Sequence, residues 1–526
     1  MAAAPSQNAS PPEHGSVAVN KWLIAVAVML ATIMEVLDTT IANVALLHIR
    51  GSLSAGVDEA AWVLTSYIVA NAIVIPLTGW CGAFFGRKRF FTFSILLFVT
   101  SSLLAGASPN LPTLIFFRVL QGIGGGAMMP MSQAILMETF PPEQQAVAMA
   151  VWGVGMMLGP VMGPVLGGWI TDNYSWRWIF YINVPIGLIA ATMVAVFVHD
   201  PDYIRRGIKK IDWWGIIFLA IGVGFIQVML DKGDRLDWFN SKLIVELTVI
   251  GTIGVVLFLI RELRTKEPVV ELRVLNNRTF AVGTVFTTIV MFAMYGTYVL
   301  IPLYCQQIAG YTPLQAGFVL SIQSFGTFAS IMLAGRLFTM MDPRVLIAGG
   351  CLIAGYGTWG MANFNPQIDF WNIAMPGIYR GIGSGLIFIP ITTLSLGAVS
   401  NEEMGNASGL FNMVRSVGGS IGIAILVAMV SRHTQIHQSY LSARIDPFRF
   451  QEWSHSNPGI TAQYNRFTLH GAAPYLGMIY QEVQRQAAIL AYVDDFRLIS
   501  YIFLFLTPLA FVMRRPAKMG TAPAVH

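Results

Sequence analysis

Charged residues are scarce in this chain, and their scarcity excludes most soluble proteins. Only 11% of the 526 residues are charged, whereas 55% are hydrophobic. A soluble chain of this length would carry far more charge and would divide into several domains. The three cysteines, Cys81, Cys305 and Cys351, lie far apart beside or within apolar runs, which excludes a disulfide scaffold and a cysteine metal site. The composition is therefore that of a membrane protein.

Motifs for nucleotide and metal chemistry are also missing. The chain has no GxxxxGK[ST] phosphate loop, no HExxH motif and no cluster of metal ligands. The glycine-rich strings at Gly122 and Gly381 lie inside apolar runs and follow no strand, which excludes a dinucleotide site. The net charge of +5 comes from short basic clusters between apolar runs, so we expect no nucleic-acid partner. The sequence predicts a protein that is not an enzyme and holds no metal or cofactor.

Long apolar runs are what the chain has in abundance. A helix needs about 20 apolar residues to cross a membrane, because each residue rises about 1.5 Å through a core about 30 Å thick. We identify about fourteen such runs, in the order six, two, six. They are 22–46, 61–80, 90–107, 112–136, 145–170, 178–198, 213–231, 243–261, 280–303, 314–338, 344–361, 371–397, 405–430 and 497–513. These runs predict an all-α, polytopic membrane protein.

Lys and Arg gather in alternate loops, which sets the orientation. The clusters at 87–89, 205–210, 261–278 and 514–518 all fall on one side, and by the positive-inside rule that side is the cytoplasm. Both termini are then cytoplasmic, and the polar N-terminus has no basic segment of the kind that opens a removable signal peptide. The predicted parts are a disordered cytoplasmic tail, 1–20; an N-terminal six-helix bundle, 21–200; a two-helix linker with a cytoplasmic loop, 201–279; a C-terminal six-helix bundle, 280–515, with an outer loop, 432–494; and a cytoplasmic tail, 516–526.

The chain repeats itself at a nearly constant offset. The segment around Gly79, LTGWCGAFFGRKRFF, aligns with LAGRLFTMMDPRVLI around Gly335. FFRVLQG, with Arg118, aligns with IYRGIGSG, with Arg380, and EQQAVAMAVWGVG aligns with EEMGNASGLFNMV. Equivalent runs start on the same side, so the two six-helix units are parallel pseudo-repeats, an arrangement of transporters that rock two halves around a central site.

Five motifs in order carry a family resemblance over nearly the whole chain. They are LDTTIANVAL, GWCGAFFGRKR, RVLQGIGGG, GVGMMLGPVMGPVLGG and SWRWIFYINVPIG. With them the chain resembles the fourteen-helix members of the major facilitator superfamily, in its second drug:proton antiporter family, and is similar to EmrB-type multidrug efflux proteins. One position departs from the pattern. The loop after the second run normally carries an acid before its second glycine, and here that neighbourhood begins with Ala83.

The resemblance implies a major facilitator fold and a proton-driven exporter of small amphipathic compounds in the bacterial inner membrane. It implies no cofactor beyond the proton gradient. In a Gram-negative cell it also implies a periplasmic membrane-fusion adaptor of the EmrA type and an outer-membrane channel. The periplasmic loop 432–494 is the candidate for docking them.

Glu35 and Asp38 are the acids that such a mechanism would use. They lie three residues apart in the first run and share one face of a helix. A carboxylate at bilayer depth costs about 2.5–3.5 kcal/mol, so it normally faces a bundle interior or a watery cavity. Burial favours the neutral acid and a cation favours the anion, so such a group can exchange a proton for a substrate. The alternative is an ion pair that only fixes packing. The resemblance supports Asp38, whereas Glu35 lies outside the matched motif, and runs nine to thirteen carry no mid-span acid.

Three arginines, Arg118, Arg380 and Arg415, lie within apolar runs. Arg118 and Gln121 share a helix face. The resemblance would bring Arg118 near Asp38, with Arg380 opposite them, so that Arg118 holds the carboxylate ionised until a proton or a substrate breaks the contact. The alternative is an arginine that only orients its helix through backbone carbonyls, and this alternative is stronger for Arg415.

Glycine and basic residues suggest where the protein changes conformation. The fifth run carries glycine every fourth residue, which lets a neighbouring helix approach closely, and two prolines that can bend it. The alternative is ordinary packing of small residues, which carries no information on the direction of transport. The resemblance, by contrast, associates this pattern with exporters. The basic loop after the second run is explained in part by membrane orientation. Because the second half contains a copy of it, the loop is also a candidate for a cytoplasmic latch between conformations. These conformational candidates are Gly79, Gly86, Arg87, Lys88, Gly155, Gly159, Pro160, Gly163, Pro164 and Gly167.

Candidates for contact with a substrate are polar or aromatic residues in apolar spans, where most aromatic side chains face lipid or core. They are Asn43, Trp62, Tyr67, Asn71, Gln121, Met129, Tyr295, Tyr298, Arg380 and Asn412. The leading hypothesis is proton-coupled export of amphipathic drugs by alternating access. A dedicated exporter of one metabolite, such as a fatty acid, a bile salt or a siderophore, is the alternative. A transporter-like sensor and a permease that works with a separate ATPase are further alternatives.

Overall fold

The computed structural model describes residues 20–200, 212–265, 267–365, 367–443 and 473–513. Within these ranges the regular structure is helical, as predicted. Thirteen of the described helical segments are long and apolar enough to cross a membrane. The remaining predicted span, 344–361, corresponds to a further helix, α14 (Pro343–Met361). The tails 1–20 and 516–526 lie outside the described residues apart from Asn20, as do the basic clusters 205–210 and 514–518.

The N-terminal half contains six spans, four of which are built from consecutive shorter helices. The composite spans are Glu59–Phe85, Leu111–Thr139, Pro142–Asn173 and Trp178–Phe197. The helices are α1 (Lys21–Ser52), α2 (Val57–Val74), η1 (Ile75–Leu77), α3 (Thr78–Phe85), α4 (Arg87–Gly106), α5 (Leu111–Gly125), α6 (Met128–Thr139), η2 (Pro142–Gln144), α7 (Gln145–Asn173), α8 (Trp178–Tyr181) and α9 (Asn183–Phe197). Asn20 and Asn110 cap α1 and α5 through their side-chain oxygens.

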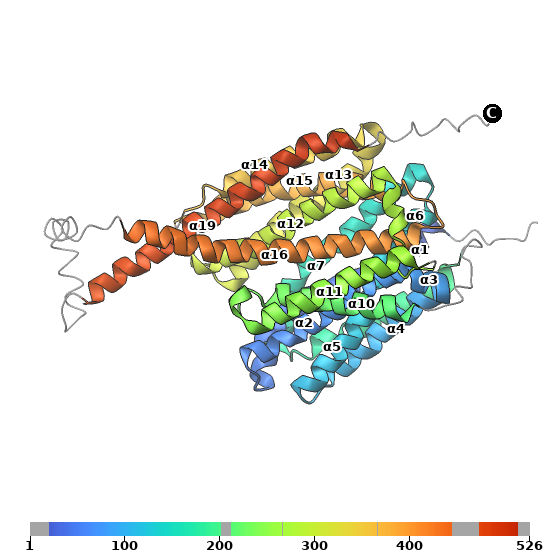
Figure 1. Cartoon of the computed structure of the whole chain (residues 1–526), viewed down its shortest axis with the longest axis horizontal. Helices are drawn as coiled ribbons and strands as arrows, with labels where there is room; N and C mark the ends of the chain where they lie inside the picture. The colour runs from blue at the N-terminus through green and yellow to red at the C-terminus, as the bar shows by residue number, and fades with distance from the viewer. Residues whose placement is uncertain (1–19, 201–211, 266, 366, 444–472, 514–526) are drawn as a thin grey trace, which may run out of the picture.

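Two linker helices and a second set of six helices complete the described chain. They are α10 (Trp213–Lys232), η3 (Trp238–Asn240), α11 (Lys242–Arg264), η4 (Leu272–Asn276), α12 (Arg278–Gln307), α13 (Pro313–Met340), α14, α15 (Phe370–Leu396), α16 (Met404–Ser442), α19 (Ala473–Leu509) and η5 (Ala510–Val512). In Figure 1 the two halves lie above and below one another, with α10 and α11 in front of the seam. The order six, two, six is thus the order of the helices.

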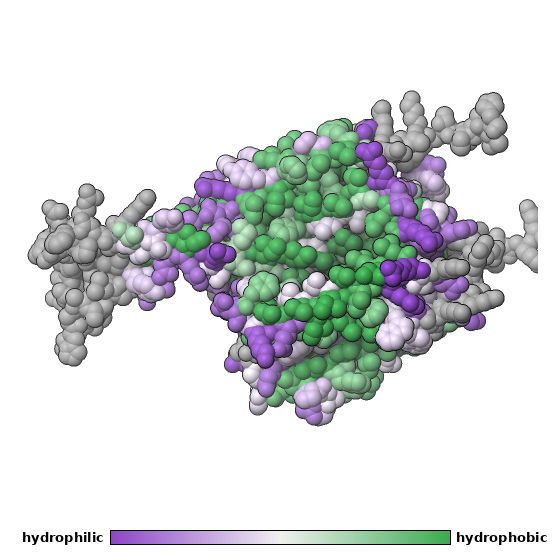
Figure 2. Space-filling view, in the orientation of Figure 1, coloured by the Kyte–Doolittle hydropathy of each residue, from purple (hydrophilic) through white to green (hydrophobic). Residues whose placement is uncertain are grey.

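The surface fits a bilayer. Figure 2 shows a broad apolar belt across the middle of the visible face, with hydrophilic residues at both ends of the helices. The linker helix α11 contributes to this belt through exposed Val249, Ile253 and Leu257. Large exposed apolar surfaces are unfavourable in water and favourable against lipid. The protein is a multi-pass membrane protein.

Glycines let one pair of helices pack closely in each half. In the N-terminal half a methyl group placed at Gly159 of α7 would lie 2.2 Å from Val36 of α1. In the C-terminal half a methyl group placed at Gly422 of α16 would lie 2.3 Å from the carbonyl oxygen of Phe292 of α12. Contacts this short require glycine, so each half uses bare backbone to bring its first and fifth helices together.

The helices α16 and α19 are longer than the sequence predicted. The predicted spans end at 430 and begin at 497, whereas α16 continues to Ser442 and the last span begins at Tyr480. Both helices project past the rest of the bundle at its left end in Figure 1. The predicted loop 432–494 is therefore helical at both edges, and its middle, 444–472, lies outside the described residues.

Candidate functional site

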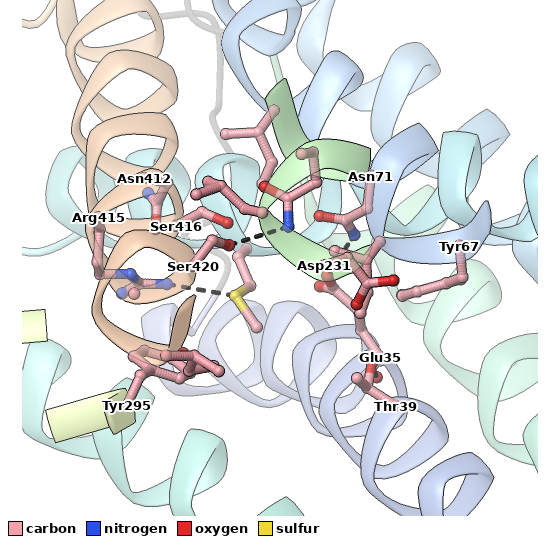
Figure 3. A pocket seen from close by; sticks show the side chains of 17 residues that line it. Glu35, Thr39, Tyr67, Asn71, Asp231, Tyr295, Asn412, Arg415, Ser416 and Ser420 are labelled. Atoms are coloured by element: carbon pink, nitrogen blue, oxygen red, sulfur yellow. Dashed lines mark hydrogen bonds between the residues drawn. The ribbon is translucent and has the colours of Figure 1, made fainter. Parts of the chain in front are cut away.

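A cavity of about 280 Å³ lies where the two halves and the linker meet. Its walls come from α1, α2, η1 and α6 of the N-terminal half, from α10, and from α12 and α16 of the C-terminal half. The polar lining, most of which is labelled in Figure 3, is Glu35, Thr39, Tyr67, Asn71, Gln227, Asp231, Tyr295, Asn412, Arg415, Ser416 and Ser420. A mostly apolar cavity with a few convergent polar groups is the usual form of a small-molecule site.

Glu35 is the carboxylate of α1 that reaches this cavity. It is 4% exposed, and its Oε1 accepts a hydrogen bond of 3.0 Å from Asn71 Nδ2. Its Oε2 has no hydrogen-bond partner among the described residues. A buried carboxylate that is ionised needs a partner for each oxygen, whereas a protonated one needs fewer acceptor bonds. Glu35 is therefore placed to change its protonation state without breaking an ion pair.

Arg415 of α16 also lines the cavity, from the C-terminal half, and Figure 3 shows it on the opposite wall from Glu35. Its Nη2 lies 3.3 Å from Met129 Sδ, and its guanidinium carbon lies 5.5 Å from the Trp152 ring centroid. Its Nη1 has no hydrogen-bond partner in the described part of the chain. Glu35 and Arg415 thus face one another across the seam between the halves, and neither forms a direct ion pair with any described residue.

Asp38 has a different environment, although it lies one turn from Glu35. Its Oδ2 accepts a bond of 2.6 Å from Arg118 Nη1, and its Oδ1 accepts bonds from Gln121 at 2.8 Å and Asn183 at 2.7 Å. Asp38 is 2% exposed and does not line the cavity. Three donors inside the N-terminal half thus occupy both oxygens of the aspartate.

Arg118 is satisfied by the same network. Its Nε donates to the carbonyl oxygen of Val63 at 3.0 Å, and its guanidinium carbon lies 4.3 Å from the centroid of the Tyr67 ring. Asn183 also donates to Ser102 Oγ at 3.0 Å. The predicted meeting of Arg118 and Asp38 is therefore present, with the predicted helix neighbour Gln121 as a third member. Asn183 and Ser102 complete the network, and sequence reasoning did not select them.

Arg380, the repeat counterpart of Arg118, is not opposite Asp38 at the cavity. It is fully buried inside the C-terminal half, and its guanidinium carbon lies 4.9 Å from the Tyr298 ring centroid. None of its three guanidinium nitrogens has a hydrogen-bond partner among the described residues. The equivalent arginines of the two halves therefore differ in their partners, because Arg118 is paired with Asp38 and Arg380 has no hydrogen-bond partner among the described residues.

The linker helix α10 is part of the cavity wall, which the sequence did not suggest. Thr65 of α2 donates to Asp231 Oδ2 at 2.5 Å, and Gln227 donates to Ser420 Oγ of α16 at 3.0 Å. One hydrogen bond therefore ties α10 to each half. Both Gln227 and Asp231 are polar residues one helical turn apart in an otherwise apolar run, and this spacing is the signal that could have identified them.

The halves also meet directly at the end of the bundle where α1 and α4 begin, which we call the basic end. Ser408 of α16 donates to the carbonyl oxygen of Pro130 at 2.8 Å, and Asn412 donates to Gln133 Oε1 at 2.7 Å. A methyl group placed at Gly79 would lie 2.1 Å from Asn406 Oδ1. These contacts close the seam at the basic end.

The basic loop itself is anchored within the N-terminal half. Gly86 has φ +87°, a value that favours glycine, between α3 and α4. Arg87 forms an ion pair with Glu138 of α6, and the backbone N–H of Lys88 donates to Asp200 Oδ1 at 2.8 Å. Two acids from elsewhere in the half thus contact the loop, although Ala83 replaces the acid expected within it.

The remaining predicted residues divide into two groups. Tyr67, Asn71, Met129, Tyr295 and Asn412 line the cavity. Asn43 and Trp62 are exposed and do not line it. Asn43 donates to the carbonyl oxygen of Thr39 in its own helix, and Lys232 lies over the Trp62 ring.

The helix-packing candidates of the fifth run lie on α7, which includes Pro160 and Pro164. Three of them, Gly155, Gly163 and Gly167, face α1 together with Gly159, where methyl groups would meet Met29, Thr40 and Ile41.

One buried acid of the membrane region lies outside the first span and was not selected from the sequence. Asp495 is fully buried in α19, within the candidate span Tyr480–Val512. Its Oδ1 lies 3.9 Å from Nδ1 of His433 on α16. Sequence reasoning missed it because the last run was taken to begin at 497, beyond this residue.

Comparison with known proteins identifies the family of this fold. The model of the Major Facilitator Superfamily matches residues 28–423. The chain belongs to the major facilitator superfamily. Within this superfamily it is 36% identical to the probable multidrug resistance protein EmrY of Escherichia coli, over 94% of this chain and 96% of that protein. It is also 36% identical to the multidrug export protein EmrB of Haemophilus influenzae, over 94% and 95% of the two chains. The predicted resemblance to EmrB-type proteins is thus confirmed.

Two further comparisons concern another relative and a solved structure. The chain is 32% identical to the fatty acid resistance protein FarB of Neisseria gonorrhoeae, over 97% of this chain and 99% of that protein. The crystal structure of the human organic anion transporter MFSD10 aligns with a TM-score of 0.59 over 92% of this chain and 99% of that chain. Its sequence identity is 12%, so this structural likeness shows the fold alone.

Proposed function

We propose that this protein is a proton-coupled exporter of amphipathic compounds that works by alternating access between its two halves. The observation that carries the proposal is the carboxylate of Glu35, which has one uncommitted oxygen in a cavity lined by both halves. The EmrB-type relatives, which are named multidrug export proteins, support the direction of transport. No cofactor other than the proton gradient enters this proposal.

Glu35 is the proton carrier in this scheme, and Asp38 supports it from within the N-terminal half. In the state open to the outside, Glu35 takes a proton, becomes neutral and releases the substrate. The neutral carrier then exposes the cavity to the cytoplasm, where Glu35 loses its proton and the cavity accepts a new substrate. Neutralising a buried carboxylate removes its desolvation cost, so protonation favours the rearrangement. Asp38 is unsuited to this step because its charge is already matched by Arg118.

The proposed orientation places the basic end in the cytoplasm, together with both termini, in the inner membrane of a bacterium. Lys and Arg concentrate at this end, as the positive-inside rule requires. Because the halves are in contact there, the described state is one that is closed toward the cytoplasm. One proton that moves down 100 mV supplies about 2.3 kcal/mol, and a pH gradient adds to this.

The proposed assembly includes a periplasmic adaptor of the membrane-fusion type and an outer-membrane channel. The projecting ends of α16 and α19 are the part of the described chain that reaches farthest beyond the bundle (Figure 1). These ends lie on the side opposite the basic end (Figure 1). This is the side on which a periplasmic adaptor has access.

A dedicated exporter of a single metabolite is the second candidate. The 32% identity to a fatty acid resistance protein favours a fatty acid in that case. A panel of amphipathic compounds separates the two candidates, because a dedicated exporter moves one chemical class and a multidrug exporter moves several.

Transport by purified protein in liposomes tests the proposed function. We expect drug movement that is driven by an imposed pH gradient without ATP, and that stops when an ionophore dissipates the gradient. Protons should move in the opposite direction at the same time. A requirement for ATP would contradict the proposal, and so would drug binding without proton countermovement.

A further inference from the structure

The C-terminal half buries a cation for which the helices packed against it provide no counterion. Arg380 is fully buried on α15, and this helix packs against α7, α12, α13, α14 and α16. The helices α12 to α16 contain no Asp or Glu, and the single acid of α7, Asp172, lies near the C-terminal end of that helix. The buried acid of this half, Asp495, lies on α19 near His433. An unpaired buried charge is strongly unfavourable, so the environment of Arg380 calls for an anion from outside the chain.

Other polar groups near Arg380 share this lack of partners. The side chain of Gln323, from α13, is fully buried, and neither its Nε2 nor its Oε1 is hydrogen-bonded among the described residues. A methyl group placed at Gly377, one turn before Arg380, would lie 2.9 Å from Gln323 Oε1. The guanidinium of Arg380 lies over the ring of Tyr298, and the buried hydroxyl of this tyrosine has no hydrogen-bond partner in the described part of the chain. Polar groups from three helices are therefore left unsatisfied in one region.

We propose that Arg380, with Tyr298 and Gln323, forms a binding site for a single monovalent anion in the C-terminal half. Arg380 supplies up to five N–H donors in a planar fork, and Tyr298 and Gln323 supply an O–H and an N–H₂ donor. A carboxylate matches this fork through two parallel hydrogen bonds, and an inorganic anion such as chloride matches its charge alone. The anion is thus either the carboxylate of an amphipathic molecule or a small inorganic ion.

The site lies beside the central cavity. Tyr295 lines the cavity, and Tyr298 follows it by one turn of α12. On its other side, the backbone of Arg380 abuts α14, because a methyl group placed at Gly357 would lie 2.4 Å from the Arg380 nitrogen. The route of entry that we propose is therefore from the cavity side, past Tyr298. Occupation by a transported carboxylate rests on the proposed function, whereas anion binding itself does not.

Thermal unfolding of the purified full chain, in a chloride-free zwitterionic buffer, tests the site without any transport. Octanoate and chloride are added separately, and octanol serves as the uncharged match for octanoate. A ligand that binds only the folded protein raises its melting temperature. We expect octanoate or chloride to raise the melting temperature of the parent, and octanol to leave it unchanged. An effect of octanoate alone identifies a carboxylate site, and an effect of chloride alone identifies an inorganic-ion site.

Variants assign the effect to Arg380. We expect Arg380→Met to abolish the anion-dependent shift, and the matched variant Arg336→Met, at an exposed arginine of α13, to retain it. Without anion, Arg380→Met should be at least as stable as the parent, because it removes an unpaired buried charge. If Arg380→Met does not fold, Arg380→Lys keeps the charge without the fork and should bind octanoate more weakly. Two results overturn the proposal: no shift with either anion, or a shift that survives both changes at Arg380.

Discussion

The two halves of this protein use the same helix packing but different electrostatics. Each half brings its first and fifth helices together on glycines, Gly159 in one and Gly422 in the other. The equivalent arginines differ: Arg118 pairs with Asp38, whereas Arg380 meets no acid among the described residues. Packing is thus repeated, while charge is balanced in only one half.

This difference separates structural from functional charge. A buried ion pair whose members are fully hydrogen-bonded contributes to one rigid arrangement, and breaking it is costly. A buried or cavity-lining charge without a partner is costly in the resting state, and it becomes favourable when a proton or a ligand arrives. On this criterion we propose that Asp38 and Arg118 belong to the framework, whereas Glu35, Arg415 and Arg380 are the charges that a proton or a ligand can neutralise.

The largest effect is expected when the paired charge of the N-terminal half is broken. Asp38→Asn leaves Arg118 buried without a counterion, so we expect a loss of about 3–5 kcal/mol in the free energy of unfolding. Thermal unfolding in detergent measures this loss, and transport should fall with it. The double variant Asp38→Asn/Arg118→Gln should recover part of the stability. If the single variant unfolds at the parental temperature, Asp38 is not a framework residue. That result would favour Asp38 as the proton-coupling group, as the family resemblance implies.

The next effect is specific to transport. Glu35→Gln removes the titratable group and keeps an oxygen that can accept from Asn71, so we expect near-parental stability. Proton countermovement in liposomes, followed with a pH-sensitive dye, should fall to the level of empty vesicles. Glu143→Gln makes the same chemical change at an exposed site near the basic end and should transport normally. Persistent countermovement in Glu35→Gln would remove Glu35 as the proton carrier.

The sequence predicted the fold because apolar length and basic clusters report directly on membrane crossing. The pairing of Arg118 with Asp38 was expected from the family resemblance, which brings the two residues together, and the structure has this contact. The start of the last span was not predicted, since Asp494, Asp495 and Arg497 interrupt its apolar pattern. Asp495 is nevertheless buried, because α16 covers it and presents His433.

The composition of the cavity was less predictable than the fold. Asn71 and Asn412 stood out as polar groups in apolar runs, and both line it. The contribution of α10 depends on how the linker docks on the seam. The spacing of Gln227 and Asp231 marks a polar face of α10, but it does not say against which helices that face packs. The free oxygen of Glu35 and the committed oxygens of Asp38 likewise depend on partners that are distant in sequence, such as Asn183.

Replacing the glycine at the contact between the first and fifth helices should destabilise the protein to a similar extent in either half. Gly159→Ala and Gly422→Ala each place a methyl group against a neighbouring helix, so we expect each to cost about 1–3 kcal/mol by overpacking. Gly168→Ala is the matched control on α7, because a methyl group there meets nothing within 4 Å. Thermal unfolding of the three variants measures the difference. A large cost at Gly159 with none at Gly422 would show that the two halves do not share this packing.

The smallest effect concerns α10, which is bonded to both halves. Ser420→Ala removes the acceptor of Gln227 and leaves the bond from Thr65 to Asp231 intact. We expect a cost of about 0.5–1.5 kcal/mol, because a single hydrogen bond is lost. Hydrogen exchange should increase in α10 near Gln227, while α2 keeps its protection. Thr65→Val is the reciprocal variant and should free α10 from the N-terminal half instead. If neither variant changes exchange in α10, apolar contacts alone hold the linker at the seam, and its two hydrogen bonds do not couple the halves.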